Sequence, residues 1–517
     1  MSHTPAPHDE LPGRHPWEEP PPDGWSSSLP DLGKELGLFV VSAALLFGVI
    51  RIIHHARKLG MVEQHGFAFA LLIALWLSVC LIAASLSVYL YRRLGGLGIL
   101  TAMLTDYGRL ARMGGRPPVW LDAPPSGGLR VAHLSDLHVT ETDLVRMVER
   151  PHPGGNRQLD RVLDSPPLYD ADVILVTGDV TDRGTAAAWR HFLDAVEERE
   201  IADKMVIVPG NHDIAFVDHI VRKRALRLDR FGIVQLANLL KFCEAFADTM
   251  GGRHGVVWID GEPRHYAEAW AEAEKAVRPL VAELPTMAVP PLTLRRWFKQ
   301  RRAFFDYVEK IESARARLME LFPVAIPMAH ADSVVFVLNS VSRVSRHPAL
   351  NAIGRIGRGQ YKRLDKLARQ FPQRLKLVAV HHHLVRRGEE QSAKFVTRLF
   401  AKFTVLGDSR PLVKFCIRWG VRAVLNGHRH LSYQLRLPTG TVLLAAPSST
   451  LGDELAHDAR PQFERYDFAP RADADTVGIF RAAIRLPRDP TPPPPPIQAD
   501  DADEPDDPSG PPTSLPT

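Results

Sequence analysis

The sequence predicts an α/β fold whose functional side chains collect at one edge of a β-sheet. Five short apolar runs rich in β-branched residues are typical of buried strands, and polar residues follow each run directly. The runs cover residues 129–134, 173–177, 205–209, 375–380 and 422–426. Helix-period segments occur elsewhere, as in residues 233–246 and 303–322. Because loops at the carboxyl ends of strands meet in one crevice, we expect the five polar clusters to form one site.

Seven potential metal ligands follow these strands. They are Asp136, His138, Asp179, Asn211, His381, His428 and His430. Mixed carboxylate, imidazole and amide-oxygen ligands suit Mn, Fe or Zn. Asp179 can bridge two cations, with Asp136, His138 and His430 completing one site and Asn211, His381 and His428 the other. Two such ions about 3.5–4 Å apart polarise a phosphoryl oxygen and generate a hydroxide for in-line attack at phosphorus. A lone residue of this kind is more often a loop or core side chain, but five ordered clusters outweigh that alternative.

The motifs of this set resemble those of the calcineurin-like metallophosphoesterase superfamily. They read Asp-x-His, Gly-Asp-x-x-Asp-Arg-Gly, Gly-Asn-His-Asp, a triple-His run and Gly-His-x-His, within residues 129–488. The resemblance implies two mixed β-sheets sandwiched by helices, with a site for two divalent metal ions at the strand ends. It implies the ligand assignment above and favours His381 as the ligand from the triple-His run. His382 and His383 are expected to orient neighbours, face substrate or fill the loop.

Three further residues are candidates for catalysis without binding metal. In the family, the His that matches His212 stabilises the transition state or protonates the leaving group, which is general acid catalysis. Asp182 or Asp213 could hold this ring in the useful tautomer. Arg183 is a candidate phosphate clamp because its planar guanidinium can bind two oxygens, and the alternative is a structural ion pair between Arg183 and Asp182.

The variants of two motifs point to a branch of the family. Protein phosphatases that share Gly-Asp-x-x-Asp-Arg-Gly usually carry Gly-Asn-His-Glu and a different His loop. This chain has Gly-Asn-His-Asp and Gly-His-Arg-His instead. It is therefore more similar to the cyclic-nucleotide and lipid-precursor phosphodiesterases.

Composition suggests a catalytic domain between two solvated tails. The 517 residues carry a net charge of +5, which does not argue for nucleic acid, and we expect no nucleic-acid partner. Cys80, Cys243 and Cys416 form no disulfide framework, which favours a reducing compartment. Residues 1–33 and 489–517 are rich in Pro and acidic groups and are expected to be disordered.

Two apolar segments within residues 34–93 predict a two-helix transmembrane hairpin, followed by a linker over residues 94–128. Residues 66–91 contain no charged side chain, and residues 36–53 are interrupted only by Arg51. The alternatives are a cleaved signal peptide and a buried core hairpin. Basic residues flank the hairpin ends slightly more than its loop, so we expect the catalytic domain on the cytoplasmic side of the inner or plasma membrane.

A mostly helical insertion is expected at about residues 215–330. Strand patterning stops after Gly-Asn-His-Asp and resumes only near residues 333–339. Within the insertion, residues 219–227 and 294–302 are basic, and the second segment also carries Trp297 and Phe298. That composition favours an anionic membrane surface or a phosphorylated head group, and the alternative is an ordinary solvated helix.

These features predict a membrane-tethered, dimetal-dependent phosphoester hydrolase. The expected substrate is a phosphodiester or pyrophosphate, and the tether and basic insertion motivate a lipid-linked one. A soluble-substrate phosphatase or cyclic-nucleotide phosphodiesterase is an alternative. A membrane scaffold that keeps the fold without turnover is another, although all seven ligands and His212 are present.

Overall fold

A computed structural model describes most of the catalytic part of the chain. The described residues are 115–141, 144–147, 150–153, 155–215, 228–283, 306, 309–341, 353–385, 406–452, 460–470 and 477–487. The predicted tails and transmembrane hairpin lie outside them, as do most of the predicted linker and the basic segments 219–227 and 294–302. Within the described residues, none of the helices has both the length and the apolar character needed to cross a bilayer.

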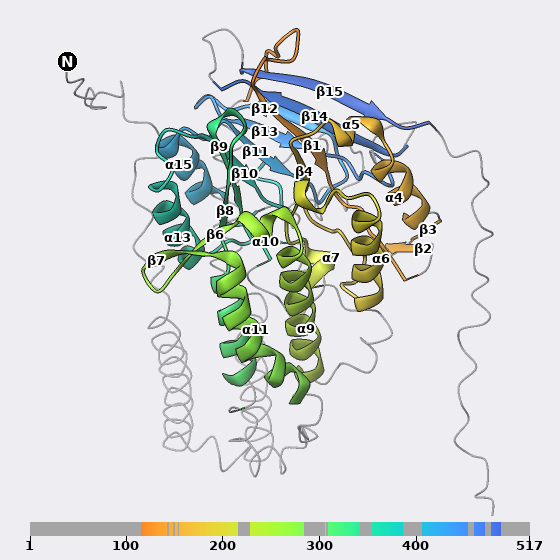
Figure 1. Cartoon of the computed structure of the whole chain (residues 1–517), viewed down its shortest axis with the longest axis vertical. Coiled ribbons are helices and arrows are strands. Elements are labelled where there is room, and N and C mark those ends of the chain that lie inside the picture. Colours follow the sequence, from red (N-terminus) through yellow and green to blue (C-terminus); the bar gives the residue numbers. More distant parts are fainter. Residues whose placement is uncertain are drawn as a thin grey trace, which may run out of the picture. The chain divides into compact units, whose positions relative to one another are not determined.

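Two mixed β-sheets form the centre of the domain (Figure 1), as the family resemblance implied. The smaller sheet has the order β15-β14-β1-β4-β5. Its strands are β1 (Leu129–Leu134), β4 (Val173–Val176), β5 (Met205–Ile207), β14 (Gln462–Phe468) and β15 (Ile479–Arg485). Strands β1, β4 and β5 are parallel, whereas β14 pairs antiparallel with both β1 and β15.

The larger sheet has the order β12-β13-β11-β10-β9-β8-β6-β7. Its strands are β6 (Val256–Ile259), β7 (Glu262–His265), β8 (Val324–Met328), β9 (Ser333–Val337), β10 (Leu375–Ala379), β11 (Ala423–Asn426), β12 (Tyr433–Arg436) and β13 (Val442–Ala445). Strands β9, β10, β11 and β13 are parallel, and the remaining pairings are antiparallel. A separate small hairpin joins β2 (Leu144–Met147) and β3 (Arg150–Pro153).

Helices cover the outer faces of both sheets. On one side of Figure 1 lie α4 and α6, and on the other side lie α13 and α15. The helices are α4 (Gly155–Leu163), α5 (Pro166–Tyr169), α6 (Ala186–Glu197), α7 (Asn211–Ile214), α9 (Leu228–Ala247), α10 (Met250–His254), α11 (Tyr266–Glu283), α13 (Arg358–Ala368) and α15 (Ser409–Trp419). A left-handed Gly420 ends α15 because glycine tolerates that conformation.

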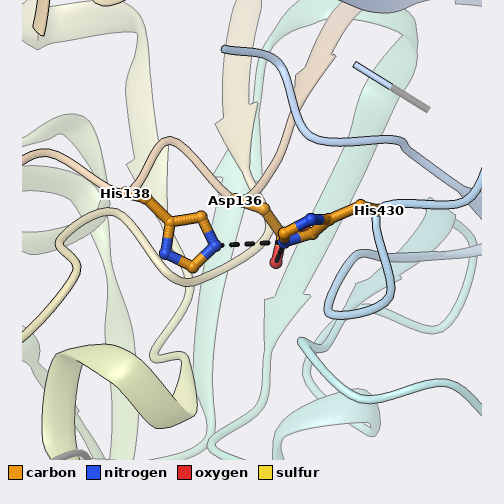
Figure 2. Close-up of side chains that lie close together, drawn as sticks. All are labelled: Asp136, His138 and His430. Carbon is orange, nitrogen blue, oxygen red and sulfur yellow. Dashed lines mark hydrogen bonds and ion pairs between the residues drawn. The ribbon is translucent and has the colours of Figure 1, made fainter. Parts of the chain in front are cut away.

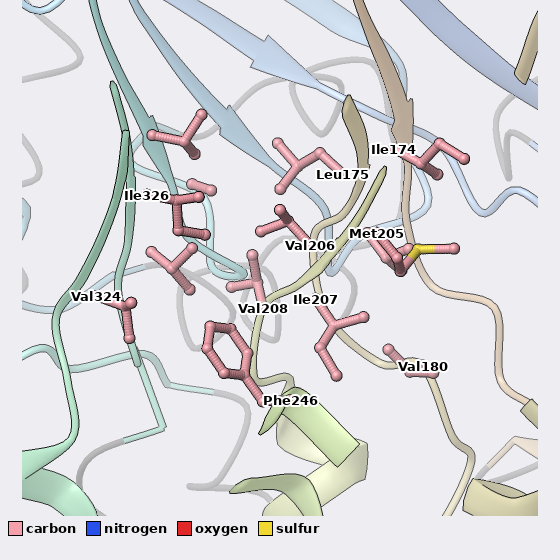
Figure 3. Close-up of a cluster of buried hydrophobic side chains, with 14 of the residues drawn as sticks. Ile174, Leu175, Val180, Met205, Val206, Ile207, Val208, Phe246, Val324 and Ile326 are labelled. Carbon is pink, nitrogen blue, oxygen red and sulfur yellow. The ribbon is translucent and has the colours of Figure 1, made fainter. Parts of the chain in front are cut away.

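Alternation along the strands explains how the larger sheet is buried on both faces. Leu377 and Ala379 of β10 face the core between the sheets, whereas Val378 packs in the outer cluster with α13 and α15. Val206 of β5 and Val324 of β8, with Phe246 from the end of α9, belong to the core between the sheets (Figure 3). This two-layer core holds the strand ends, and therefore the polar loops that follow them, in fixed relative positions.

The predicted insertion contains strands as well as helices. Its described residues form α9, α10 and α11, a further helical stretch over residues 309–320, and the strands β6, β7 and β8, which extend the larger sheet. The expectation that strand patterning resumes only near residue 333 was therefore wrong. β7 is an exposed four-residue edge strand that contains Pro263, so it carries no alternating apolar signal.

Candidate metal centre

All seven predicted ligands lie at the carboxyl ends of five strands. Asp136 and His138 follow β1, Asp179 follows β4, and Asn211 begins the short helix α7 after β5. His381 follows β10, and His428 and His430 follow β11. Six of the seven side chains are buried, and His428 is half-buried. The two sheets therefore each supply part of one site, which is why its residues are distant in sequence.

One group consists of Asp136, His138 and His430, shown in Figure 2. The Nε2 atoms of His138 and His430 lie 3.0 Å apart. Oδ1 of Asp136 is 3.6 Å from Nε2 of His430. The backbone N–H of His428 donates to both oxygens of Asp136, at 3.1 and 2.9 Å, which fixes the orientation of this carboxylate.

A second group consists of Asp179, Asn211, His381 and His428. Nε2 of His381 lies 3.2 Å from Oδ2 of Asp179, 3.0 Å from Oδ1 of Asn211 and 3.1 Å from Nδ1 of His428. Nδ1 of His381 donates to the carbonyl oxygen of Thr177 at 2.8 Å, which leaves the Nε2 lone pair for a ligand. Four candidate ligand atoms therefore surround one point.

The spacing and chemistry of these atoms fit divalent ions. Nitrogen and oxygen ligands about 2.0–2.2 Å from an ion lie about 3 Å apart when they are neighbours in octahedral geometry and about 3.4 Å apart in tetrahedral geometry. The contacts between ligand atoms in the two groups match the octahedral separation at 3.0–3.2 Å, apart from the longer Asp136–His430 distance. Bridging by Asp179 stays a prediction. Its Oδ2 faces the second group, and its Oδ1 accepts the backbone N–H of His212 at 2.8 Å.

Opposite charges are concentrated in the pocket. Burial raises the pKa of Asp179, but His381 and His212 outweigh burial and hold that pKa well below its ordinary range. Burial lowers the pKa of His381, but Asp179 raises it to about 9. The pKa of His212 is lowered by burial and raised by Asp179 and Asp182 to about 10. Asp179 thus stabilises positive charge on the neighbouring imidazoles, and a bound cation would replace the protons of those rings.

Two other ligand histidines respond differently. Burial lowers the pKa of His138, and it lowers the pKa of His428 well below the ordinary value. Both rings are therefore neutral near pH 7, the form in which imidazole binds a metal.

The backbone is strained at the proposed ligands. Five of the seven have positive φ: Asp136 (52°), His138 (50°), Asp179 (49°), His428 (80°) and His430 (50°). Only four other non-glycine residues of the described part do so. Such conformations cost about 1–3 kcal/mol each and persist where the surrounding structure enforces them, most often at functional sites.

Glycines allow the ligand loops to pack closely. A Cβ at Gly210 would meet the backbone and carboxylate of Asp179, and a Cβ at Gly427 would meet the hydroxyl of Ser135 and the carboxylate of Asp136. Gly178, with a φ of 97°, packs in the same way against the ring of His381. The glycines of the sequence motifs are therefore required by the approach of one loop to another.

Asp182 joins two histidines of the site. Its Oδ1 lies 3.6 Å from Nδ1 of both His138 and His212, and its backbone carbonyl accepts Nδ1–H of His212 at 2.9 Å. Burial raises the pKa of Asp182, but the two nearby imidazole rings outweigh burial and lower that pKa. The structure places Asp182 at this position, whereas Asp213 accepts backbone N–H groups of Val180, Thr181 and Gly210. Arg183 makes the ion pair with Asp182, at 3.4 Å from Nε to Oδ2.

The three histidines of the triple-His run have different surroundings. His381 alone lies among ligand atoms of the second group. Nδ1 of His382 lies 2.7 Å from the hydroxyl of Ser340, and His383 packs against the ring of Tyr433 with centroids 5.3 Å apart.

Residues 129–308 match the family model described as calcineurin-like phosphoesterase. These residues belong to that family. The predicted resemblance is thereby confirmed, and so is the expectation that the protein is a phosphoester hydrolase. A comparison with curated protein sequences gave no match.

Three solved structures resemble the chain weakly. A dimetal phosphatase from Danio rerio has a TM-score of 0.33 and 11% identity, over 70% of this chain and 99% of that one. A phosphopantetheinyl hydrolase from Mycobacterium tuberculosis has a TM-score of 0.28 and 14% identity, over 63% and 91% of the two chains. A purple acid phosphatase from yellow lupin (Lupinus luteus) seeds has a TM-score of 0.33 and 13% identity, over 69% and 55%.

Sequence reasoning missed the hydroxyl groups that support the ligand loops of this phosphoesterase domain. Ser448 donates to the carbonyl oxygen of Asp136 at 2.7 Å, and Thr450 donates to that of Leu137 at 2.9 Å. The backbone N–H of Ser135 donates to the hydroxyl of Ser449 at 3.1 Å. The only sequence signal was the Pro-Ser-Ser-Thr stretch that follows Gly-His-Arg-His.

Proposed function

We propose that this protein is a dimetal-dependent hydrolase of phosphodiesters or pyrophosphates. The observation that supports two ions, and not one, is the pair of ligand groups at strand ends of the two sheets, each with one carboxylate and two imidazoles. When bound, two divalent ions supply Lewis acidity to phosphoryl oxygens and lower the pKa of water.

The ligand residues themselves are held in binding orientation before any ion arrives. His381 is anchored through Nδ1 to the carbonyl of Thr177, and Asp136 is anchored by the N–H of His428. Preorganised ligands lose little conformational freedom on binding, so the geometry for a phosphoryl group is fixed in advance.

His212 is our candidate for the general acid. Its Nδ1–H donates to the carbonyl oxygen of Asp182, so Nε2 is the nitrogen that delivers a proton to a leaving oxygen. Asp182 and Asp179 stabilise the doubly protonated ring, which is the form that a general acid needs. Asp182 also faces His138, so it orients a metal ligand and the acid together.

The substrate class rests on sequence features. The motifs Gly-Asn-His-Asp and Gly-His-Arg-His favour diester or pyrophosphate cleavage over protein phosphatase activity. The charge-free residues 66–91 favour a membrane tether, and the basic residues 294–302 favour an anionic, lipid-linked substrate.

The mechanism is tested by hydrolysis of two chromogenic esters with the full-length protein in added Mn²⁺. We expect bis-p-nitrophenyl phosphate to be cleaved faster than p-nitrophenyl phosphate. Asp179→Ala should abolish turnover, and His212→Ala should lower kcat about 10²–10⁴-fold, as loss of a general acid does. Asp203→Ala and His265→Ala, both exposed, are matched controls that should leave turnover unchanged. A metal-loaded protein that cleaves neither ester would refute the proposal and favour the scaffold alternative.

A second experiment tests the lipid-linked substrate. Full-length protein in anionic vesicles is given a lipid pyrophosphate or a short-chain, water-soluble pyrophosphate ester. Faster cleavage of the lipid form is expected because the tether and the basic segment would raise its local concentration. Equal cleavage rates for the lipid and the water-soluble pyrophosphate would favour a soluble substrate.

A further inference from the structure

His133 is a buried polar residue that the proposed mechanism does not use. It lies in β1, three positions before the ligand Asp136, and its side chain is fully buried. Nε2 of His133 lies 2.9 Å from the hydroxyl of Thr177, at the end of the neighbouring strand β4. A buried histidine is expensive to keep in a strand unless its polar atoms serve a purpose.

Two further hydrogen bonds continue from Thr177 to the metal ligand. The Thr177 hydroxyl lies 2.9 Å from that of Ser135, and the Ser135 hydroxyl donates to Oδ2 of Asp136 at 2.5 Å. The four residues joined by these hydrogen bonds have no exposed surface; they are His133, Thr177, Ser135 and Asp136. The last distance is in the range of a hydrogen bond to an ionised oxygen.

The Asp136 carboxylate, which accepts hydrogen bonds at both oxygens, sets the direction of every donor. Ser135 has one hydroxyl hydrogen, and Asp136 takes it, so Thr177 donates to Ser135 at 2.9 Å, a shorter contact than its 3.3 Å to the carbonyl of Leu134. Thr177 then has no hydrogen left for His133, and His133 must donate through Nε2–H. Burial lowers the pKa of His133 to about 3, so the ring is neutral and holds this one proton.

The chain decides which oxygen of Asp136 is left for a metal. Oδ2 accepts the Ser135 hydroxyl, and both oxygens share the N–H of His428, at 2.9 Å from Oδ2 and 3.1 Å from Oδ1. Oδ1 is the oxygen nearest His430 in the first ligand group, 3.6 Å from its Nε2. The Ser135 hydroxyl, which bonds Oδ2 alone, therefore leaves Oδ1 as the oxygen that faces the group.

Thr177 serves the second ligand group as well. Its backbone carbonyl accepts Nδ1–H of His381 at 2.8 Å, while its hydroxyl acts on Asp136 through Ser135. The end of β4 thus positions a ligand of each group.

We propose that His133, Thr177 and Ser135 form a hydrogen-bond chain that positions Asp136 for metal binding, with His133 as its terminal donor. These are positioning residues, and the inference rests on the proposed metal centre. Neighbours that orient a ligand in this way change metal affinity by about 10–100-fold when they are removed.

The test measures Mn²⁺ binding to the full-length protein by titration calorimetry, without substrate. Thr177→Val keeps the side-chain shape but breaks the chain, and His133→Phe keeps a ring but removes the donor. Each should weaken one Mn²⁺ site about 10–100-fold, and Thr177→Ser, which restores the hydroxyl, should recover affinity. Thr249→Val removes an equally buried hydroxyl that bonds the carbonyl of Phe246 and not a predicted ligand, and should bind Mn²⁺ normally.

The double variant separates a chain from independent contacts. Because the bonds act in series, His133→Phe with Thr177→Val should bind Mn²⁺ no more weakly than Thr177→Val alone. Wild-type affinity in Thr177→Val and His133→Phe, or losses that add in the double variant, would overturn the inference. Thermal melting of each variant shows that it is folded, and Thr177→Ser keeps the test valid if His133→Phe does not fold. A wild type that binds two Mn²⁺ but cleaves no ester would refute the proposed function and leave this inference intact.

Discussion

Asp182 shows how one carboxylate can serve two functional residues at once. It lies 3.6 Å from Nδ1 of both His138 and His212. A single negative charge therefore orients a predicted ligand and stabilises the protonated form of the predicted acid. Its third partner, Arg183, is the residue for which a phosphate clamp and a structural ion pair are the two alternatives.

Asp182→Asn keeps the size of this side chain and removes its charge. We expect kcat for the diester to fall about 10–100-fold because both histidines lose their oriented partner. Arg183→Ala separates the alternatives. A phosphate clamp predicts a raised KM, whereas a structural pair predicts a KM close to wild type with a lower melting temperature. Full activity in Asp182→Asn would contradict the role given to this residue.

Gly427 is a residue where a single methyl group should disturb the centre. A Cβ there would overlap the Ser135 hydroxyl, which bonds to Asp136. Gly427→Ala should destabilise the fold by about 1–3 kcal/mol, as overpacking does, and should weaken Mn²⁺ binding. Gly359→Ala, in α13 where a Cβ would meet only the Arg363 side chain at an ordinary contact distance of 3.5 Å, should bind Mn²⁺ normally and gain about 0.5–1 kcal/mol of stability. Calorimetric titration and denaturant unfolding measure the two effects, and normal Mn²⁺ affinity in Gly427→Ala would count against the packing argument.

At the scale of elements, α9 connects the insertion to the loop that carries Asp182. Nδ2 of Asn238 donates to the carbonyl of Arg183 at 3.4 Å, and Nζ of Lys241 donates to the carbonyl of Gly184 at 3.0 Å. Burial lowers the pKa of Lys241, so its charge is held next to these carbonyls at a cost in solvation. The insertion helix thereby fixes the loop that carries Asp182.

Removing this connection should affect rate more than metal content. In the double variant Asn238→Ala with Lys241→Met, the loop loses both bonds, and we expect kcat to fall about 10-fold or more because small misplacements of catalytic groups are costly. Bound Mn²⁺ should stay at the wild-type ratio, since neither side chain is a ligand. Glu244→Ala is the control on the same helix, where it removes only an exposed pair with Arg278. If the bound Mn²⁺ and kcat both fell in the double variant, α9 would instead support the whole site.

At the scale of the whole molecule, the sequence-based prediction agrees with the structure where a residue's position is marked by its neighbours in sequence. Every predicted ligand directly follows a β-branched run or opens the loop after one, so strand ends and ligands could be predicted together. The support of Asp136 could not be read in this way, because Thr177 and Ser448 reach it only through pairing of distant strands. β7 was missed because a four-residue exposed edge strand shows no apolar period, and β6 because four apolar residues alone do not distinguish a strand from a helix segment.

The assembled centre also makes stability depend on metal. Without ions, Asp179 is ionised among buried imidazoles, and five ligands hold a left-handed backbone that costs free energy. An ion that binds the folded chain alone stabilises it by about 2.7 kcal/mol when its free concentration is 100 times Kd. Mn²⁺ should therefore raise the melting temperature of the wild type, and a chelator should reverse the rise. Asp179→Ala should show almost no rise, whereas Asp203→Ala should behave as the wild type. A rise in Asp179→Ala equal to that of the wild type would place the stabilising ion outside the seven ligands.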